Sequence, residues 1–272
     1  RGLGDVYKRQ LSVLISDGPS GNGLTLFAPT NEAFEAAGIT ELPDAATLNA
    51  VLRYHVLDGT VTSGDLPAGG AEIQTLNGKF NLSNVDAGVF INGTSQVTEV
   101  DIEETNGVVH VIDRTLIPPS QNIAEIVVAS AGADPAEFTL LLAAVQTAGL
   151  TDLLAGEGAF TVFAPTDAAF NKAGFPDVAS VEAADPALLT AILSHHVVDP
   201  TAVPIRVFST DLTDGQVVPM FNEQDITINL QDLTIQDAFG SNPPAGLVVD
   251  LLDINATNGV IHVIDEVLLP AL

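Results

Sequence analysis

An internal duplication constrains this sequence more than any other feature. Three segments of the first half return in the second half in the same order, while the spacing between them grows. Preserved order with growing spacing is what a duplicated domain with loop insertions produces. The repeated segments are TLFAPTNEAF (25–34) and TVFAPTDAAF (161–170), VLRYHVLD (51–58) and ILSHHVVD (192–199), and NGVVHVID (106–113) and NGVIHVID (258–265).

The two copies predict two domains, with a boundary at PPSQN, residues 118–122, where two prolines end the first copy. We expect the first domain over 11–119 and the second over 120–272. Residues 1–10, RGLGDVYKRQ, hold three of the eight cations of the chain. This stretch resembles translated cloning sequence, so we interpret it as a non-native leader and exclude it from the fold.

The copies differ ahead of the FAPT segment. In the second copy, Phe138, Leu141, Leu142 and Val145 follow the spacing i, i+3, i+4, i+7 of an amphipathic helix. The first copy has only residues 11–24 in the corresponding place. We therefore expect the first domain to be truncated at its N-terminus, to expose apolar surface and to be the less stable half.

Charge is the strongest signal in the composition. The chain has 35 acidic residues against 8 basic ones, a net charge of −27, which excludes nucleic acid as a partner. It contains no cysteine, so disulfides and thiolate chemistry are excluded. No apolar run approaches the roughly 18 residues of a membrane span. The acidic surface is consistent with an exported protein.

Each copy of the central helix places a histidine on its apolar face. The helical spacing is shared by Leu48, Val51, Leu52 and His55, and by Leu189, Ile192, Leu193 and His196. An unpaired polar group in a core costs about 1–3 kcal/mol. We therefore interpret His55 and His196 as core histidines with bonded ring nitrogens, and expect His195 beside them to be more exposed.

The NGVVHVID and NGVIHVID segments are predicted to be strands that are buried on both faces. Val108, His110 and Ile112 share one face, and the opposite face is also mainly apolar. Such a strand belongs in the middle of a sheet. We interpret His110 and His262 as structural, because no serine, cysteine or glutamate recurs beside both of them as a duplicated catalytic set would require.

The FAPT segments predict a strand followed by a short capped helix. Thr30 and Thr166 stand where an N-cap residue is needed, and acidic residues follow in the first turn. Gly38 and Gly174 then provide a C-terminal stop. This corner contains no nucleophile paired with a base, so its role is predicted to be structural.

These motifs together identify a resemblance to the fasciclin (FAS1) domain family, present twice. The first copy carries TLFAPTNEAF, YHV, INGTSQV and NGVVHVIDRTLIPP in that order; the second carries FTVFAPTDAAF, HHV and NGVIHVIDEVLLP. The resemblance implies an α+β fold of two tandem domains, each a wedge of mainly antiparallel strands flanked by helices.

The same resemblance implies a secreted or cell-surface protein of adhesion or matrix contact that catalyses no reaction. Its expected partners are extracellular matrix, a cell-surface protein or a polysaccharide, and no catalytic, cofactor or metal residue is expected. In animal members a tyrosine-histidine segment and an Asp-Ile pair have been implicated in integrin contact. Those segments correspond to Tyr54-His55 and Asp101-Ile102 in the first copy, and to His195-His196 and Asp253-Ile254 in the second.

Two other functions remain open at this point. One is an extracellular protein that binds a small ligand or a divalent cation, for which DLTDGQ (211–216) and QDLTIQD (231–237) could supply oxygen ligands. The other is a hydrolase that uses His110 or His262 with a nearby carboxylate. A signal sequence ahead of residue 11 is expected for the exported protein.

Overall fold

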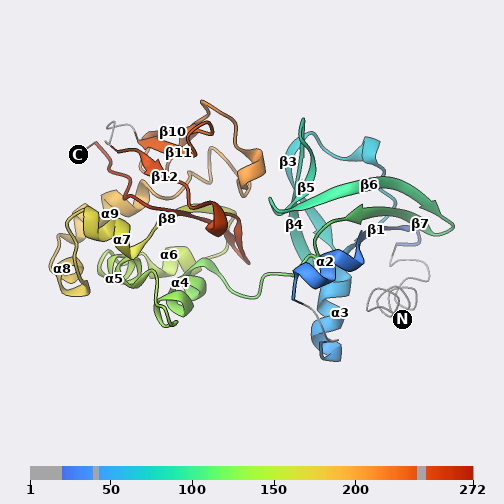
Figure 1. Ribbon diagram of the computed structural model, residues 1–272, viewed down its shortest axis with the longest axis horizontal. Coiled ribbons are helices and arrows are strands. Elements are labelled where there is room, and N and C mark those ends of the chain that lie inside the picture. Colours follow the sequence, from blue (N-terminus) through green and yellow to red (C-terminus); the bar gives the residue numbers. More distant parts are fainter. Residues whose placement is uncertain (1–19, 39–42, 238–242, 272) are drawn as a thin grey trace. The chain divides into compact units, whose positions relative to one another are not determined.

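The computed structural model describes residues 20–38, 43–237 and 243–271. The chain forms two compact units that divide between Pro118 and Pro119 (Figure 1). Both units combine helices with mainly antiparallel sheets, so the predicted α+β class is confirmed. The predicted leader, residues 1–10, lies outside the described residues.

Unit 1 contains one seven-stranded sheet, ordered β2-β1-β7-β6-β5-β4-β3. Strand β7 lies between β1, to which it is parallel, and β6, to which it is antiparallel. The predicted central position of the NGVVHVID strand is therefore confirmed. The elements are β1 (Leu24–Pro29), α2 (Asn31–Ala36), α3 (Ala45–Tyr54), β2 (Val56–Asp58), η1 (Ser63–Asp65), β3 (Gly69–Thr75), β4 (Gly78–Val85), β5 (Gly88–Ile91), β6 (Ser95–Glu104) and β7 (Gly107–Ile112).

Unit 2 contains a three-stranded sheet, β13-β14-β8, and a four-stranded sheet, β12-β11-β10-β9. Its helices are α4 (Ile123–Ala131), α5 (Thr139–Thr147), α6 (Thr151–Ala155), α7 (Asp167–Lys172), α8 (Val178–Glu182), α9 (Pro186–Ser194), η2 (Ser209–Asp211) and η3 (Val249–Leu251). Its strands are β8 (Phe160–Pro165), β9 (Val217–Pro219), β10 (Asp225–Asn229), β11 (Thr234–Asp237), β12 (Ala245–Gly246), β13 (Ile254–Ala256) and β14 (Gly259–Ile264).

The β8 and β14 strands form the middle layer of unit 2. In Figure 1 helices α4, α5 and α6 lie on one side of β8, and β10 to β12 lie on the other. Side chains alternate accordingly: Val162 and Ile261 belong to the helical core, whereas Phe163 and Ile264 belong to the core under the four-stranded sheet. This arrangement explains why every residue of β14 is buried.

The corresponding strand of unit 1 is less covered. Val109 and Val111 of β7 are half-buried, whereas Ile261 and Val263 at the matching positions of β14 are fully buried. Burial of apolar surface is the main favourable term in folding. Lower stability of unit 1 therefore stays a prediction, which domain-resolved unfolding would test.

The predicted N-caps of the FAPT helices are confirmed in both units. Thr30 accepts a hydrogen bond from the Ala33 backbone N–H at 3.2 Å, and Thr166 accepts one from Ala169 at 3.1 Å. Each bond satisfies a backbone donor that the first turn of a helix leaves open. Gly174 has φ of +94° just after α7, consistent with the predicted stop.

Loss of the cap in unit 2 is expected to have a modest cost. Replacing Thr166 by alanine should lower the free energy of unfolding by about 1 kcal/mol, since it removes the bond to Ala169. Thr166→Ser, which keeps a hydroxyl, should stay within a few tenths of a kcal/mol of the original chain. Urea denaturation checks both values, and equal stability of the two variants would contradict the capping role.

Candidate functional site

The histidines that follow the two central helices make matching hydrogen bonds. His55 Nδ1 donates to the Val51 carbonyl at 2.7 Å, and its Nε2 accepts from the Leu116 N–H at 3.0 Å. His196 makes the same pair of bonds, to the Ile192 carbonyl at 2.8 Å and from the Leu268 N–H at 3.0 Å. Burial lowers the pKa of each imidazole to about 4, so both are neutral near pH 7. The prediction of bonded core histidines is confirmed.

The tyrosine of the first predicted contact segment is also part of the core. Tyr54 has no exposed surface, and its hydroxyl donates to the Lys79 carbonyl at 3.0 Å and accepts from Asn92 Nδ2 at 3.2 Å. Its ring and that of Phe80 form a T-shaped pair. The Tyr54-His55 segment therefore presents no side-chain surface to a partner.

The expectation for His195 is wrong. The sequence predicts that His195 is more exposed than its neighbour, yet its exposed fraction is 0%. Helix α9 ends at Ser194, so His195 is the C-cap residue, and its Nδ1 lies 3.0 Å from Asn222 Oδ1. Burial is the main cause of its lowered pKa. His195 contacts a residue 27 positions away in the sequence, and helical spacing does not describe such a contact, which explains the error.

The strand histidines form a second matching pair. His110 Nε2 donates to the Val61 carbonyl at 2.9 Å, and its Nδ1 accepts from the Asp101 N–H at 3.3 Å. In unit 2, His262 bonds the Val207 carbonyl at 2.8 Å and the Asp253 N–H at 3.3 Å. Each ring thus connects its own strand to the loop that contains Val61 or Val207. It also connects that strand to the segment of Asp101 or Asp253, which precedes it in the sequence.

The Asp-Ile pairs lie beside these strand histidines. Asp101 and Asp253 both have φ of +58°, and each carboxylate accepts from the backbone N–H of a serine at 2.7 Å and from the hydroxyl of the same serine, Ser63 or Ser209. The bonds from Ser63 hold the pKa of Asp101 below its ordinary value. Ile102 and Ile254 are half-buried.

The two aspartates differ in exposure. Asp101 is exposed, whereas the side chain of Asp253 is only 3% exposed. Asp101 stands in β6 between Glu99 and Ile102, where the β6–β7 register shifts. Of the predicted contact residues, Asp101 is therefore the one that combines exposure with a fixed carboxylate.

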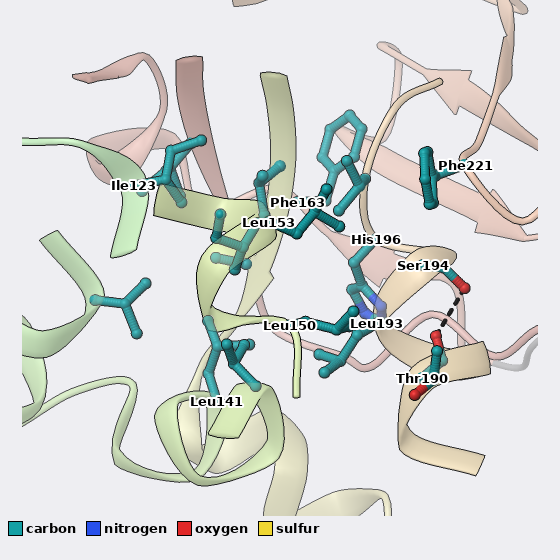
Figure 2. A pocket seen from close by; sticks show the side chains of 17 residues that line it. Ile123, Leu141, Leu150, Leu153, Phe163, Thr190, Leu193, Ser194, His196 and Phe221 are labelled. Atoms are coloured by element: carbon teal, nitrogen blue, oxygen red, sulfur yellow. Dashed lines mark hydrogen bonds between the residues drawn. The ribbon is translucent and has the colours of Figure 1, made fainter. Parts of the chain in front are cut away.

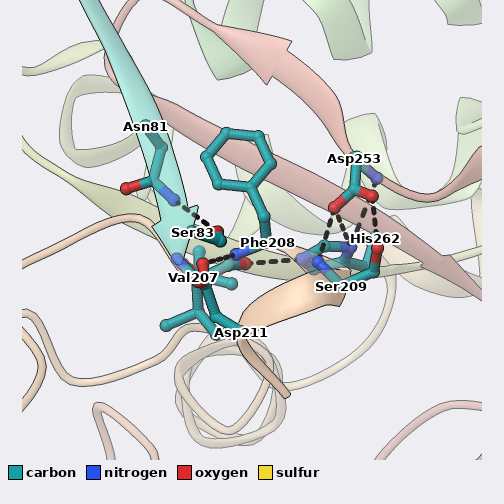
Figure 3. A network of polar contacts seen from close by, with 9 residues as sticks. Asn81, Ser83, Val207, Phe208, Ser209, Asp211, Asp253 and His262 are labelled. Atoms are coloured by element: carbon teal, nitrogen blue, oxygen red, sulfur yellow. Dashed lines mark hydrogen bonds and ion pairs between the residues drawn. The ribbon is translucent and has the colours of Figure 1, made fainter. Parts of the chain in front are cut away.

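Serine, histidine and aspartate come together in unit 2, and Figure 3 shows Ser209, Asp253 and His262 side by side. A serine nucleophile needs its hydroxyl on a histidine nitrogen that can take the proton. Here the Ser209 hydroxyl donates to Asp253, and His262 Nε2 is bonded to the Val207 carbonyl. The Asp253 carboxylate lies 3.8 Å from His262 Nδ1. These bonds stabilise the loop and do not activate the serine.

Ser63 and Ser209 were not predicted from the sequence. Both open a Ser-x-Asp motif, SGD at 63–65 and STD at 209–211, and both motifs fall in a 3-10 turn. Asp65 accepts from the Thr62 N–H at 3.1 Å, and Asp211 accepts from the Phe208 N–H at 2.9 Å. Aligning the two copies across this stretch would have revealed the repeated motif.

The acidic runs that were expected to be possible sources of calcium ligands stabilise turns instead. Asp214 accepts from the Leu230 N–H and from Gln231 Nε2, each at 2.9 Å. These bonds, with that from Gln231 as the main cause, lower the pKa of Asp214. Across residues 20–38, 43–237 and 243–271, no group of three or more histidine, aspartate or glutamate side chains is arranged to hold a metal ion.

The fold and these paired polar contacts define a protein of two tandem domains, in which the same α+β unit and the same internal histidine bonds occur twice. Sequence comparison gives the family. The Fasciclin domain model matches residues 6–118 and 136–270, so this chain belongs to the Fasciclin domain family and carries two copies of the domain. The predicted tandem resemblance is confirmed.

Relatives occur in animals and in a cyanobacterium. The chain is 31% identical to human periostin over 255 residues, 91% of this chain and 27% of periostin. It is 30% identical to the transforming growth factor-beta-induced protein ig-h3 of Sus scrofa over 269 residues, 93% of this chain and 35% of that protein. Protein sll1483 of Synechocystis is 37% identical over 136 residues, 49% of this chain and 67% of that protein.

The chain therefore spans about a quarter to a third of the length of periostin and of ig-h3. Among solved structures, a FAS1 domain pair from the insect cell adhesion molecule fasciclin I aligns with a TM-score of 0.45 at 20% identity, covering 98% of each chain. In the part of this chain that the structure describes, no helix is long and apolar enough to cross a membrane.

Proposed function

We propose that this chain is an adhesion or matrix-contact module that acts outside the cell or at its surface and catalyses no reaction. The observation that carries the proposal is the duplication of the Fasciclin domain, with His55, His110, His196 and His262 bonded inside it. Both copies use their paired histidines to hold strands and loops. The part of each copy that remains available to a partner is its surface.

That surface is strongly acidic, with a net charge of −27 for the chain. We propose that it contacts extracellular matrix, a cell-surface protein or a polysaccharide through many weak contacts. Two linked domains raise the effective concentration of the second contact once the first is made, so weak sites combine into useful avidity. Contacts of this kind weaken as salt screens them.

Attachment is expected to depend on exposed carboxylates and not on the buried tyrosine. The double substitution Glu103→Gln and Glu104→Gln, on an exposed part of β6, should weaken binding of the chain to matrix-coated surfaces and reduce its salt dependence. Tyr54→Phe should leave attachment unchanged once equal amounts of folded protein are compared, since Tyr54 is fully buried.

Cell and matrix attachment assays at two salt concentrations check this prediction. Loss of attachment in Tyr54→Phe with an intact fold would show that the tyrosine segment is the contact. Unchanged attachment after both domains are deleted from the full protein would overturn the adhesion proposal. A rise in melting temperature at saturating calcium would instead favour the alternative function, binding of a divalent cation.

A further inference from the structure

Unit 2 contains a largely enclosed cavity of about 60 Å³ between its helices and strand β8 (Figure 2). Helices α4, α5, α6 and α9 each contribute to its walls, with Ile123, Leu141, Leu153 and Leu193 among the side chains that line it. Folded proteins pack densely, and an empty space next to apolar side chains loses their contacts and costs stability. A cavity of this size is therefore a feature to explain.

The cavity offers nothing to a polar ligand. Three of its lining residues carry polar side chains, and each is already bonded elsewhere. Thr190 donates to the Pro186 carbonyl at 2.8 Å, and Ser194 donates to the Thr190 carbonyl at 2.7 Å. Both ring nitrogens of His196 are bonded to backbone groups. A buried water needs two to four polar partners, so this cavity favours an apolar occupant.

The rim of the cavity includes an exposed aromatic side chain. Phe221 is among the lining residues, yet 43% of its surface is exposed, while its backbone N–H donates to the Val197 carbonyl at 2.8 Å. Thr190 and Ser194 on α9 also line the cavity and are half-buried. An exposed phenylalanine at the rim of an apolar cavity offers an apolar surface. An alkyl chain that enters the cavity from solvent can pack against it.

Charge limits the head group of such an occupant. From residue 119 onward the sequence contains two cations, Lys172 and Arg206. Lys172 pairs with Glu266 at 2.6 Å, and Arg206 bonds Asn255 Oδ1 at 3.2 Å. Neither residue lines the cavity. A carboxylate held at this rim would gain no counter-charge, and the acidic chain would repel it.

We propose that this cavity binds the terminal alkyl segment of a neutral amphiphile, with the polar head left in solvent beside Phe221. A cavity of about 150 Å³ accepts benzene with its six heavy atoms, which is roughly 25 Å³ for each. The volume of about 60 Å³ thus accepts a segment of about two heavy atoms. The site holds the end of a chain and excludes ring systems and bulky head groups. This property adds to the proposed adhesion function and does not depend on it.

The test is a titration of the full chain, with ¹³C-labelled isoleucine, leucine and valine methyl groups, against 1-hexanol and hexanoate. We expect saturable methyl shifts with 1-hexanol that centre on Leu141, Val145 and Leu193. Hexanoate should bind about tenfold more weakly or worse, because its charge finds no partner. Absence of saturable shifts up to the solubility limit would overturn the site, and equal binding of hexanoate would overturn the neutral head group.

Matched variants locate the binding. Ser194→Leu places a larger side chain at the rim and should weaken 1-hexanol binding about tenfold, the effect of losing about two buried methylenes. Leucine is a better helix former than serine, so α9 should persist. Ala187→Leu, on the exposed part of the same helix, is the control and should leave binding unchanged. Thr190→Leu provides a second blocking variant, and unaltered binding in both blocking variants would overturn the proposal.

Discussion

Replacement of Gly107 by alanine is expected to destabilise unit 1 by about 3–5 kcal/mol, because the new methyl group would overlap backbone. A Cβ at this position would lie 2.0 Å from the Leu24 carbonyl oxygen and 2.8 Å from the Leu24 nitrogen. Leu24 and Gly107 are paired residues in the parallel β1–β7 ladder. Separating the strands would break their hydrogen bonds, so urea denaturation should show a large drop in the free energy of unfolding.

The duplication supplies a second case and the structure supplies a control. In unit 2, a Cβ on Gly259 would lie 2.5 Å from the Phe160 carbonyl oxygen, so Gly259→Ala should also be strongly destabilising. Gly64→Ala should change stability by less than about 0.5 kcal/mol, because the nearest atom to its Cβ is 3.8 Å away. Equal stability of Gly107→Ala and Gly64→Ala would contradict the close approach of β1 and β7.

These glycines show what the sequence could and could not predict. The sequence predicted the NGVVHVID and NGVIHVID strands, which begin at Gly107 and Gly259. The stronger requirement comes from a strand far away in the sequence, since Gly107 must let Leu24 approach. A local pattern carries no information on such a long-range contact.

Local features were predicted well because local residues determine them. The caps at Thr30 and Thr166 follow from the residues of a single turn. The α5 prediction was correct within one residue: the apolar spacing begins at Phe138, but Phe138 has φ of +65° and the helix starts at Thr139. The residue at which a helix begins depends on the backbone conformation of the segment before it, which the apolar periodicity does not describe.

The candidate site depended on contacts between distant segments. Periodicity predicted that His55 and His196 are buried, but not that their partners are the amides of Leu116 and Leu268. The bonds from Ser63 to Asp101 likewise join residues that lie far apart in the sequence. The transfer of contact segments by family resemblance stays a prediction, and the exposure of Asp101 makes it the residue to test first.

Acidification from pH 7 to pH 4 is expected to remove roughly 3 kcal/mol from the stability of each unit through one histidine, His55 in unit 1 and His196 in unit 2. Burial lowers the pKa of each imidazole from 6.5 to about 4. Below pH 6.5 the unfolded chain therefore binds the proton before the folded chain does. The contribution of this histidine to stability is fully present above pH 6.5, decreases as the pH falls below 6.5, and is lost near pH 4.

Neighbouring groups do not reverse this direction. His195 lowers the pKa of His196 further and Asp237 raises it, but burial is the largest cause. His195 and His262 also have pKa values lowered mainly by burial, so they add to the loss as the pH falls below 6.5. Hydrogen-bonded aspartates such as Asp101 and Asp214, with pKa values below 3.8, contribute losses mainly at lower pH.

Substitution of the histidine separates its effect from the general loss of negative charge on acidification, which changes every variant alike. His196→Gln should be less stable than the original chain by about 1–3 kcal/mol at pH 7, because backbone hydrogen bonds are lost. The deficit should shrink by roughly 3 kcal/mol between pH 7 and pH 4, since the variant has no imidazole to protonate. Urea denaturation followed by amide NMR signals of unit 2 measures this difference, and His55→Gln is the matched variant for unit 1. A His196 imidazole that titrates near pH 6.5 in the folded protein, or a deficit that is constant with pH, would show that this histidine does not set the acid sensitivity of the fold.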